Sequence, residues 1–171
     1  MLLIIAMERI RLLTITVTIV LLAAMSFARS AIYETEVTLY TDIVSRSPNK
    51  ARPHNNLGDA LKKAGRAEEA GYHFERAIEL LPDYPDALNN LATIYNNSGR
   101  KEEAYQLLSR ALALNPGHLQ ARFNLAMTLY EQGKPFESAQ QYAIIIQLVP
   151  YSKEAVFARK MLSMIQQGKS P

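Results

Sequence analysis

The sequence predicts an all-α protein, an α-solenoid of three helix-turn-helix repeats with a capping helix, preceded by one apolar helix. Two observations support this. Prolines, glycines and asparagines each recur at the same constant interval and in one register, and an uncharged stretch, residues 12–28, lies near the start of the 171-residue chain. An interval of about 34 residues shared by three residue types indicates stacked repeats rather than an irregular domain.

Composition excludes several classes of function. The chain has no cysteine, which excludes disulfides, thiolate nucleophiles and zinc–thiolate sites. Hydrophobic residues make up 49% of the chain, which is enough for a buried core. The net charge of +3 arises in residues 151–171, because basic and acidic residues balance in 1–48 and again in 49–150. No basic face therefore points to a nucleic-acid partner.

Residues 1–29 are expected to form a transmembrane or signal-anchor segment. Its uncharged part, residues 12–28, has arginines before and after it. The length of this part is close to the lower limit for spanning a bilayer, which takes roughly 17–25 residues. Alternating threonines would suggest a strand in water. An uninterrupted apolar run between arginines at the N-terminus instead favours a membrane helix.

Two interpretations of this segment stay open. It is either a retained anchor or a signal peptide that is cleaved near Ala28, where Ser26-Phe27-Ala28 resembles a cleavage site. In both cases Arg9 and Arg11 favour a cytoplasmic N-terminus. We therefore expect a single-pass membrane protein with periplasmic or lumenal repeats, or a secreted or periplasmic protein after cleavage.

Residues 30–50 are expected to be a linking helix, equivalent to the second half of a preceding repeat. The three repeats follow at 51–84, 85–118 and 119–152, and a capping helix and tail occupy 153–171. In each repeat a glycine ends the first helix and a proline ends the second. The glycines are Gly65, Gly99 and Gly133, and the prolines are Pro82, Pro116 and Pro150. Pro48 lies one period earlier, at the end of the linking helix.

Apolar residues at helical spacing mark the core face of each helix. The first helices carry pairs spaced i, i+4, such as Leu57 with Leu61, and the capping helix carries Phe157 and Met161 on one side. Gly71 lies inside a predicted helix, where it costs about 1 kcal/mol relative to alanine, and the sequence gives no reason for it.

The segments NNLGDAL, NNLATIY and FNLAMTL, each followed by a glycine, then EEA or ESA, then a proline, resemble the tetratricopeptide repeat (TPR) family. The resemblance covers residues 51–152, more than half of the chain. It implies a right-handed solenoid whose first helices line a concave surface that binds a protein or peptide partner. The third repeat departs from the pattern, because Ser138 and Ile145 replace alanines. Its second helix is therefore expected to pack against something larger than a standard repeat.

The asparagine column predicts a peptide-binding groove. Asn56, Asn90 and Asn124 each precede a core leucine and are expected to face the concave side, where carboxamides can pair with an extended peptide main chain. The column is similar to the asparagine ladder of O-GlcNAc transferases. Adjacent positions would add selectivity, namely Asn55, Asn89, Phe123, Asp59, Thr93, Met127, Lys62, Asn96 and Tyr130. The alternative is that the asparagines are tolerated polar positions beside the core.

Catalysis is not expected. His54, His73 and His118 lack a metal-binding spacing, so packing or solvated roles explain them. The glutamates that open the second helices of the first two repeats suit the helix dipole. We therefore expect no catalytic residue, no metal, no cofactor and no small-molecule substrate. Some TPR domains bind the tail of a chaperone through a clamp that requires Lys and Arg on the first helices. The third repeat has Gln120 and Asn124 instead, so we do not expect this clamp here.

The junction between the apolar segment and the repeats carries a second resemblance. An apolar helix, an acidic helix containing Leu-Tyr-x-Asp and the sequence Ser-Pro-Asn-Lys-Ala-Arg resemble the C-terminal part of TPR-containing membrane O-mannosyltransferase-like proteins. This resemblance implies an alternative function, in which the chain is the substrate-recruiting TPR segment of such a glycosyltransferase.

Overall fold

The computed structural model describes the backbone of residues 2–167, and within it the side chains of all residues except 2–8, 10 and 28–32. This part of the chain forms eight α-helices and no strand. They are α1 (Leu2–Arg46), α2 (Ala51–Lys63), α3 (Ala67–Leu80), α4 (Pro85–Asn97), α5 (Lys101–Leu114), α6 (Leu119–Glu131), α7 (Pro135–Leu148) and α8 (Lys153–Gln166).

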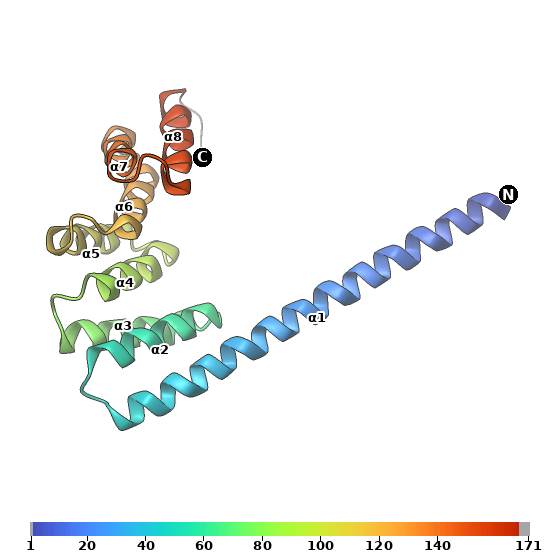
Figure 1. Cartoon of the computed structure of the whole chain (residues 1–171), viewed down its shortest axis with the longest axis horizontal. Coiled ribbons are helices and arrows are strands. Elements are labelled where there is room, and N and C mark those ends of the chain that lie inside the picture. Colours follow the sequence, from blue (N-terminus) through green and yellow to red (C-terminus); the bar gives the residue numbers. More distant parts are fainter. Residues whose placement is uncertain (1, 168–171) are drawn as a thin grey trace.

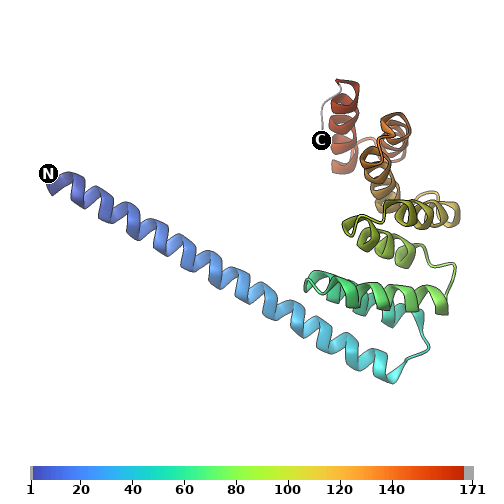
Figure 2. The same cartoon turned by 180° about the vertical axis from the view of Figure 1, so that it is seen from behind.

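From α2 to α8 the helices pack in chain order into a curved stack, which confirms the predicted all-α solenoid (Figure 1). The long helix α1 packs against α2 through its C-terminal part, where Val37 is buried and Tyr40 and Val44 add apolar contacts. The rest of α1 runs away from the stack (Figure 2). No proline or glycine lies between residues 2 and 46, so the predicted membrane segment and linking helix form one uninterrupted helix.

Over the residues that the structure describes, none of the helices combines the length and the apolarity needed to cross a membrane. The side chains of Ala28 and Arg29, which belong to the predicted cleavage site and to the flank of the apolar segment, lie outside the described residues.

The turn within each repeat follows the glycine pattern of the sequence. Gly65, Gly99 and Gly133 have φ angles of +82°, +79° and +74°, a conformation that favours glycine because it lacks a Cβ atom. After the first of these, the Arg66 amide donates to the Leu61 carbonyl, and the other two turns repeat this bond. These bonds are the 6→1 closures of a Schellman motif and satisfy carbonyls at the helix end.

Two further glycines, Gly58 and Gly71, lie inside helices and differ in how much space a Cβ atom would have. A Cβ atom on Gly58 would lie 2.6 Å from the ring of Phe74, which is fully buried and has no room to move away. Glycine at position 58 is therefore required by close helix packing. A Cβ atom on Gly71 would meet Ile94 at an ordinary 3.6 Å, so nothing in the structure explains Gly71.

The third repeat packs against the capping helix. The Ser138 hydroxyl donates to the Ala126 carbonyl at 2.7 Å, which satisfies a fully buried polar group. Ile145 is also fully buried and packs in one cluster with Ala158 and Met161 of α8. The partner expected for this unusual second helix is therefore α8, whose apolar face closes the end of the stack.

Two of the three histidines form a pair inside the first repeat. The Nδ1 atoms of His54 and His73 lie 3.0 Å apart, and His54 Nε2 lies 3.0 Å from the Pro48 carbonyl oxygen. A carbonyl only accepts, so Nε2 of His54 carries the proton, its Nδ1 accepts, and His73 donates. Burial and the neighbouring His54 lower the pKa of His73, against an opposing effect of Glu69.

The histidine pair makes stability depend on pH. Because the pKa of His73 is lower in the folded chain than in the unfolded chain, its contribution is present above the unfolded value of about 6.5 and is lost as pH falls through the folded value. We expect the melting temperature of the wild type to fall more steeply below about pH 6.5 than that of His73→Gln, which cannot titrate. Thermal unfolding at several pH values measures the melting temperature of both proteins. If the two melting temperatures fall in parallel with pH, His73 does not cause the pH dependence.

Candidate peptide-binding groove

The first helices of the three repeats form one continuous face. Helix α4 contacts both α2 and α6, whereas within the described residues no contact joins α3 to α5 or α5 to α7. Helices on the inside of a curved stack lie closer together than those on the outside. The face formed by α2, α4 and α6 is therefore the concave side, where the predicted groove residues originate.

The asparagines of this face bond from one repeat to the next. Asn90 Nδ2 donates to Asn55 Oδ1 at 3.1 Å, and Asn124 Nδ2 donates to Asn89 Oδ1 at 2.8 Å. Asn55 and Asn89 are only 8% and 6% exposed. They therefore hold the repeats together and do not offer their side chains to a ligand, which differs from the selectivity role expected from the sequence.

The three asparagines of the predicted ladder are not equivalent. Asn124 Nδ2 also donates to Thr93 Oγ1 at 3.3 Å, and its Oδ1 accepts from Gln120 at 3.1 Å. Asn90 keeps one amide hydrogen unused by the side chains that the structure describes, while its Oδ1 accepts from Lys62 at 3.4 Å. Asn56 takes part in none of these bonds between repeats and is partly exposed. The number of carboxamide groups already bonded to other side chains therefore increases from Asn56 to Asn124.

The charged positions of the first repeat pair with each other. Asp59 lies 3.0 Å from the Lys62 ammonium and 2.9 Å from that of Lys63. Burial would raise the pKa of Asp59, but hydrogen bonds and charges from the two lysines outweigh it and lower that pKa. Glu36 of α1 lies 3.6 Å from the Lys63 ammonium, so two carboxylates balance the two lysines here. The Asp59 carboxylate stays ionised near neutral pH.

The remaining predicted positions lie on α4 and α6. Asn96 Nδ2 donates to Thr128 Oγ1 at 2.7 Å, and its buried Oδ1 has no partner in the described part of the chain. The Met127 sulfur accepts from the Tyr142 hydroxyl at 3.0 Å, and burial raises the pKa of Tyr142. Tyr130 is partly exposed near the end of α6. Across the described residues, no group of three His, Cys, Asp or Glu side chains could hold a metal ion.

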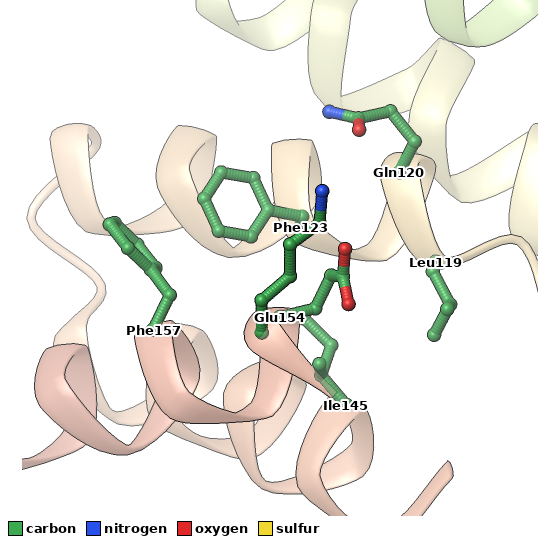
Figure 3. Close-up of a pocket in the computed structure, with 7 residues that line it drawn as sticks. Leu119, Gln120, Phe123, Ile145, Glu154 and Phe157 are labelled. Atoms are coloured by element: carbon green, nitrogen blue, oxygen red, sulfur yellow. The ribbon is translucent and has the colours of Figure 1, made fainter. Parts of the chain in front are cut away.

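The structure adds a hollow that the sequence did not reveal. It has a volume of about 490 Å³ and lies where α6 meets α8 and the end of α7 (Figure 3). Its lining consists of four apolar and three polar residues, Leu119, Phe123, Ile145, Phe157, Gln120, Lys153 and Glu154. Only Phe123 was among the predicted groove residues. Of the others, Leu119, Gln120 and Ile145 belong to the last repeat, and Lys153, Glu154 and Phe157 belong to α8, which lies outside the repeat pattern.

Comparison with known proteins agrees with this architecture. A family model described as tetratricopeptide repeat matches residues 61–111 and 99–146. The crystal structure of MamA is similar with a TM-score of 0.71 at 19% identity, covering 80% of this chain and 78% of that one. The first TPR of Spaghetti (RPAP3) bound to the HSP90 peptide SRMEEVD has a TM-score of 0.65 at 24% identity, covering 70% of this chain and 92% of that one. These structural likenesses show a shared fold.

A match in sequence connects the chain to a much larger protein. The protein O-mannosyl-transferase F38B6.6 of Caenorhabditis elegans is 36% identical over 66 residues, which are 39% of this chain and 10% of that protein. The match agrees with the resemblance to TPR-containing O-mannosyltransferase-like proteins. The chain thus aligns with about a tenth of the length of that relative.

The bonds between repeats lead to a test that separates structural from exposed asparagines. Asn124→Ala removes two donated hydrogen bonds and leaves the buried Asn89 oxygen without a partner, so it should lower the free energy of unfolding by about 1–3 kcal/mol. Asn56→Ala is the matched control and should change it by less than about 0.5 kcal/mol. Urea unfolding followed by circular dichroism measures both. Equal effects would contradict the assignment.

Proposed function

Because this chain belongs to the tetratricopeptide repeat family, we propose that it is a scaffold that binds an extended segment of another protein on the concave face of α2, α4 and α6. The observation that carries the proposal is the arrangement of carboxamides on this face. Asn56 and Asn90 retain capacity for hydrogen bonds at neighbouring repeats. Such groups can pair with main-chain N–H and C=O groups whatever the side chains of the bound segment.

A peptide in a related fold supports this proposal. The similar TPR domain of Spaghetti (RPAP3) was solved with an HSP90 peptide. The groove described above differs in chemistry from end to end, since paired charges and open carboxamides lie on α2 and α4, and apolar side chains gather near α6. An extended segment that runs along it would meet polar groups first and an apolar surface last.

Photo-crosslinking from defined positions tests where the partner binds. A photoreactive phenylalanine analogue at Asn56 or Thr93, on the concave face, should form adducts with a co-expressed cellular partner. The matched control carries the same photoreactive analogue at Arg76 or Gln106, on the second helices. It should form few adducts with the partner. The full chain is used, and each variant is first checked for unchanged helicity. Equal adduct yields from both sets of positions would contradict binding in the groove.

We also propose that residues 12–28 attach the chain to a membrane, with the repeats on the extracytoplasmic side. Large apolar side chains project from α1 in all directions between Leu12 and Phe27, and each is at least 49% exposed. The hydroxyls of Thr14, Thr16 and Thr18 donate to main-chain carbonyls of the preceding turn at 2.7–2.8 Å. Such bonding satisfies a hydroxyl without water, as a lipid environment requires.

Membrane attachment is tested by alkaline extraction. The full chain should stay with the membrane pellet, and the double variant Ile19→Arg, Leu22→Arg should move to the supernatant, since each arginine in a helix centre costs about 2.5–3.5 kcal/mol on insertion. The exposed pair Leu81→Arg, Leu114→Arg, which lies in the solenoid, is the control and should remain in the pellet. A wild type that extracts fully would overturn the proposal.

The alternative function is substrate recruitment within a membrane glycosyltransferase of the O-mannosyltransferase type. The observation that favours it is the 36% identity with the Caenorhabditis elegans protein. A transcript that continues in frame upstream of Met1 into further hydrophobic helices would support the alternative, and an in-frame stop codon directly upstream would exclude it.

A further inference from the structure

We propose that the hollow between α6 and α8 is an anchor site for one large apolar side chain, aromatic or aliphatic, on a protein segment that also carries an acidic residue next to it. The inference rests on the proposed function, because it names the chemistry of the segment bound in the groove. It extends that proposal from the carboxamides of the first two repeats to the opposite end of the concave face.

The apolar floor of the hollow is fixed by contacts among three aromatic rings. The ring of Phe123 lies 6.0 Å from that of Tyr142 in an edge-on arrangement and 5.2 Å from that of Phe157 in a tilted one. Tyr142 does not line the hollow itself, but it is fully buried and its hydroxyl bonds to the Met127 sulfur, so the ring against which Phe123 packs is held in place. Phe157 remains 41% exposed although it faces other apolar groups. An entering apolar side chain would remove this surface from water without rearranging the floor.

The polar groups at the edge of the hollow leave one positive charge without a partner. Glu154 is held by a main-chain hydrogen bond in the first turn of α8 and by Ser152, which lower its pKa, and Lys153 contributes a smaller electrostatic effect. Gln120 donates to Asn124. Lys153 forms no ion pair with any side chain that the structure describes. An acidic group on the bound segment would complete this arrangement.

Lys153 occupies a position where a positive charge is unfavourable for the helix. It is the first residue of α8, where the helix dipole favours an acidic side chain and opposes a basic one. The interaction of the Lys153 charge with the helix dipole therefore does not stabilise α8. Its ammonium is available to a ligand that approaches the groove.

The distance to the carboxamides sets the length of the segment. Neighbouring packed helices lie about 8–10 Å apart, so about 20 Å separates the hollow beside α6 from Asn56 on α2. An extended chain covers this distance in about six residues. A single short segment can therefore place an apolar side chain in the hollow while its main chain reaches the carboxamides of the first two repeats.

The experiment selects peptides from a phage-displayed library of random dodecapeptides on the full chain held in lipid nanodiscs. Peptides enriched on the wild type should carry a large apolar residue with Asp or Glu within two positions. On Lys153→Glu, the enriched peptides should carry Lys or Arg in place of the acidic residue. A synthetic peptide selected on the wild type should bind Phe157→Ala about tenfold more weakly. Val156→Ala, which alters a 64% exposed neighbour outside the hollow, should bind it unchanged.

Two outcomes separate the anchor from the groove. Enriched peptides that are insensitive to Phe157→Ala and Lys153→Glu, but bind Asn56→Ala weakly, would overturn the anchor and leave the proposed function intact. A library that shows no enrichment on the wild type would overturn both. Circular dichroism of every variant shows whether a lost interaction reflects lost folding, and Lys153→Glu changes an exposed side chain outside the core.

Discussion

The structure depends on one packing contact within each repeat, in which a small residue on the first helix faces a large one on the second. Gly58 meets the ring of Phe74, and in the next two repeats Ala92 and Ala126 share clusters with Leu108 and Tyr142. At position 58 only glycine fits against Phe74, and in the next two repeats the small side chain of alanine occupies the equivalent position. Because neither helix can bury its apolar face alone, the pair and its neighbours form together or not at all.

This tight pairing within repeats determines how the repeats meet one another. The inner faces of the first helices come close enough for asparagine side chains to bond across the boundary, from Asn90 to Asn55 and from Asn124 to Asn89. These bonds occur on the concave side, where a partner would bind. If the proposed function holds, stability between repeats and recognition use the same residue type on the same face. Each amide hydrogen bonded between repeats is then one that a partner cannot use.

The turns and the core could be predicted from the sequence because they depend on local rules. The sequence shows a constant period of three features: a glycine at positive φ, a proline after a helix, and apolar residues on one helix face.

The partners of the asparagines could not be predicted in the same way. Asn124 bonds to Asn89, one position before its equivalent Asn90 in the preceding repeat, and the 34-residue period alone does not show this offset. The hollow beside Phe123 was missed for a similar reason, since Phe157 and Lys153 come from a helix outside the repeats.

The end of the stack explains why an apolar site can exist on an otherwise polar groove. A fourth repeat would cover α7 with the usual small and large residues, whereas α8 covers it with Ala158 and Met161 and meets Ile145 in place of an alanine. At the concave edge, α6 and α8 meet through the rings of Phe123 and Phe157, whose centroids lie 5.2 Å apart. Phe123 stays partly exposed there, and Phe157 stays exposed. The groove therefore ends in apolar side chains of α6 and α8, whereas its interior carries carboxamides and paired charges, because the last repeat packs against α8 and not against another repeat.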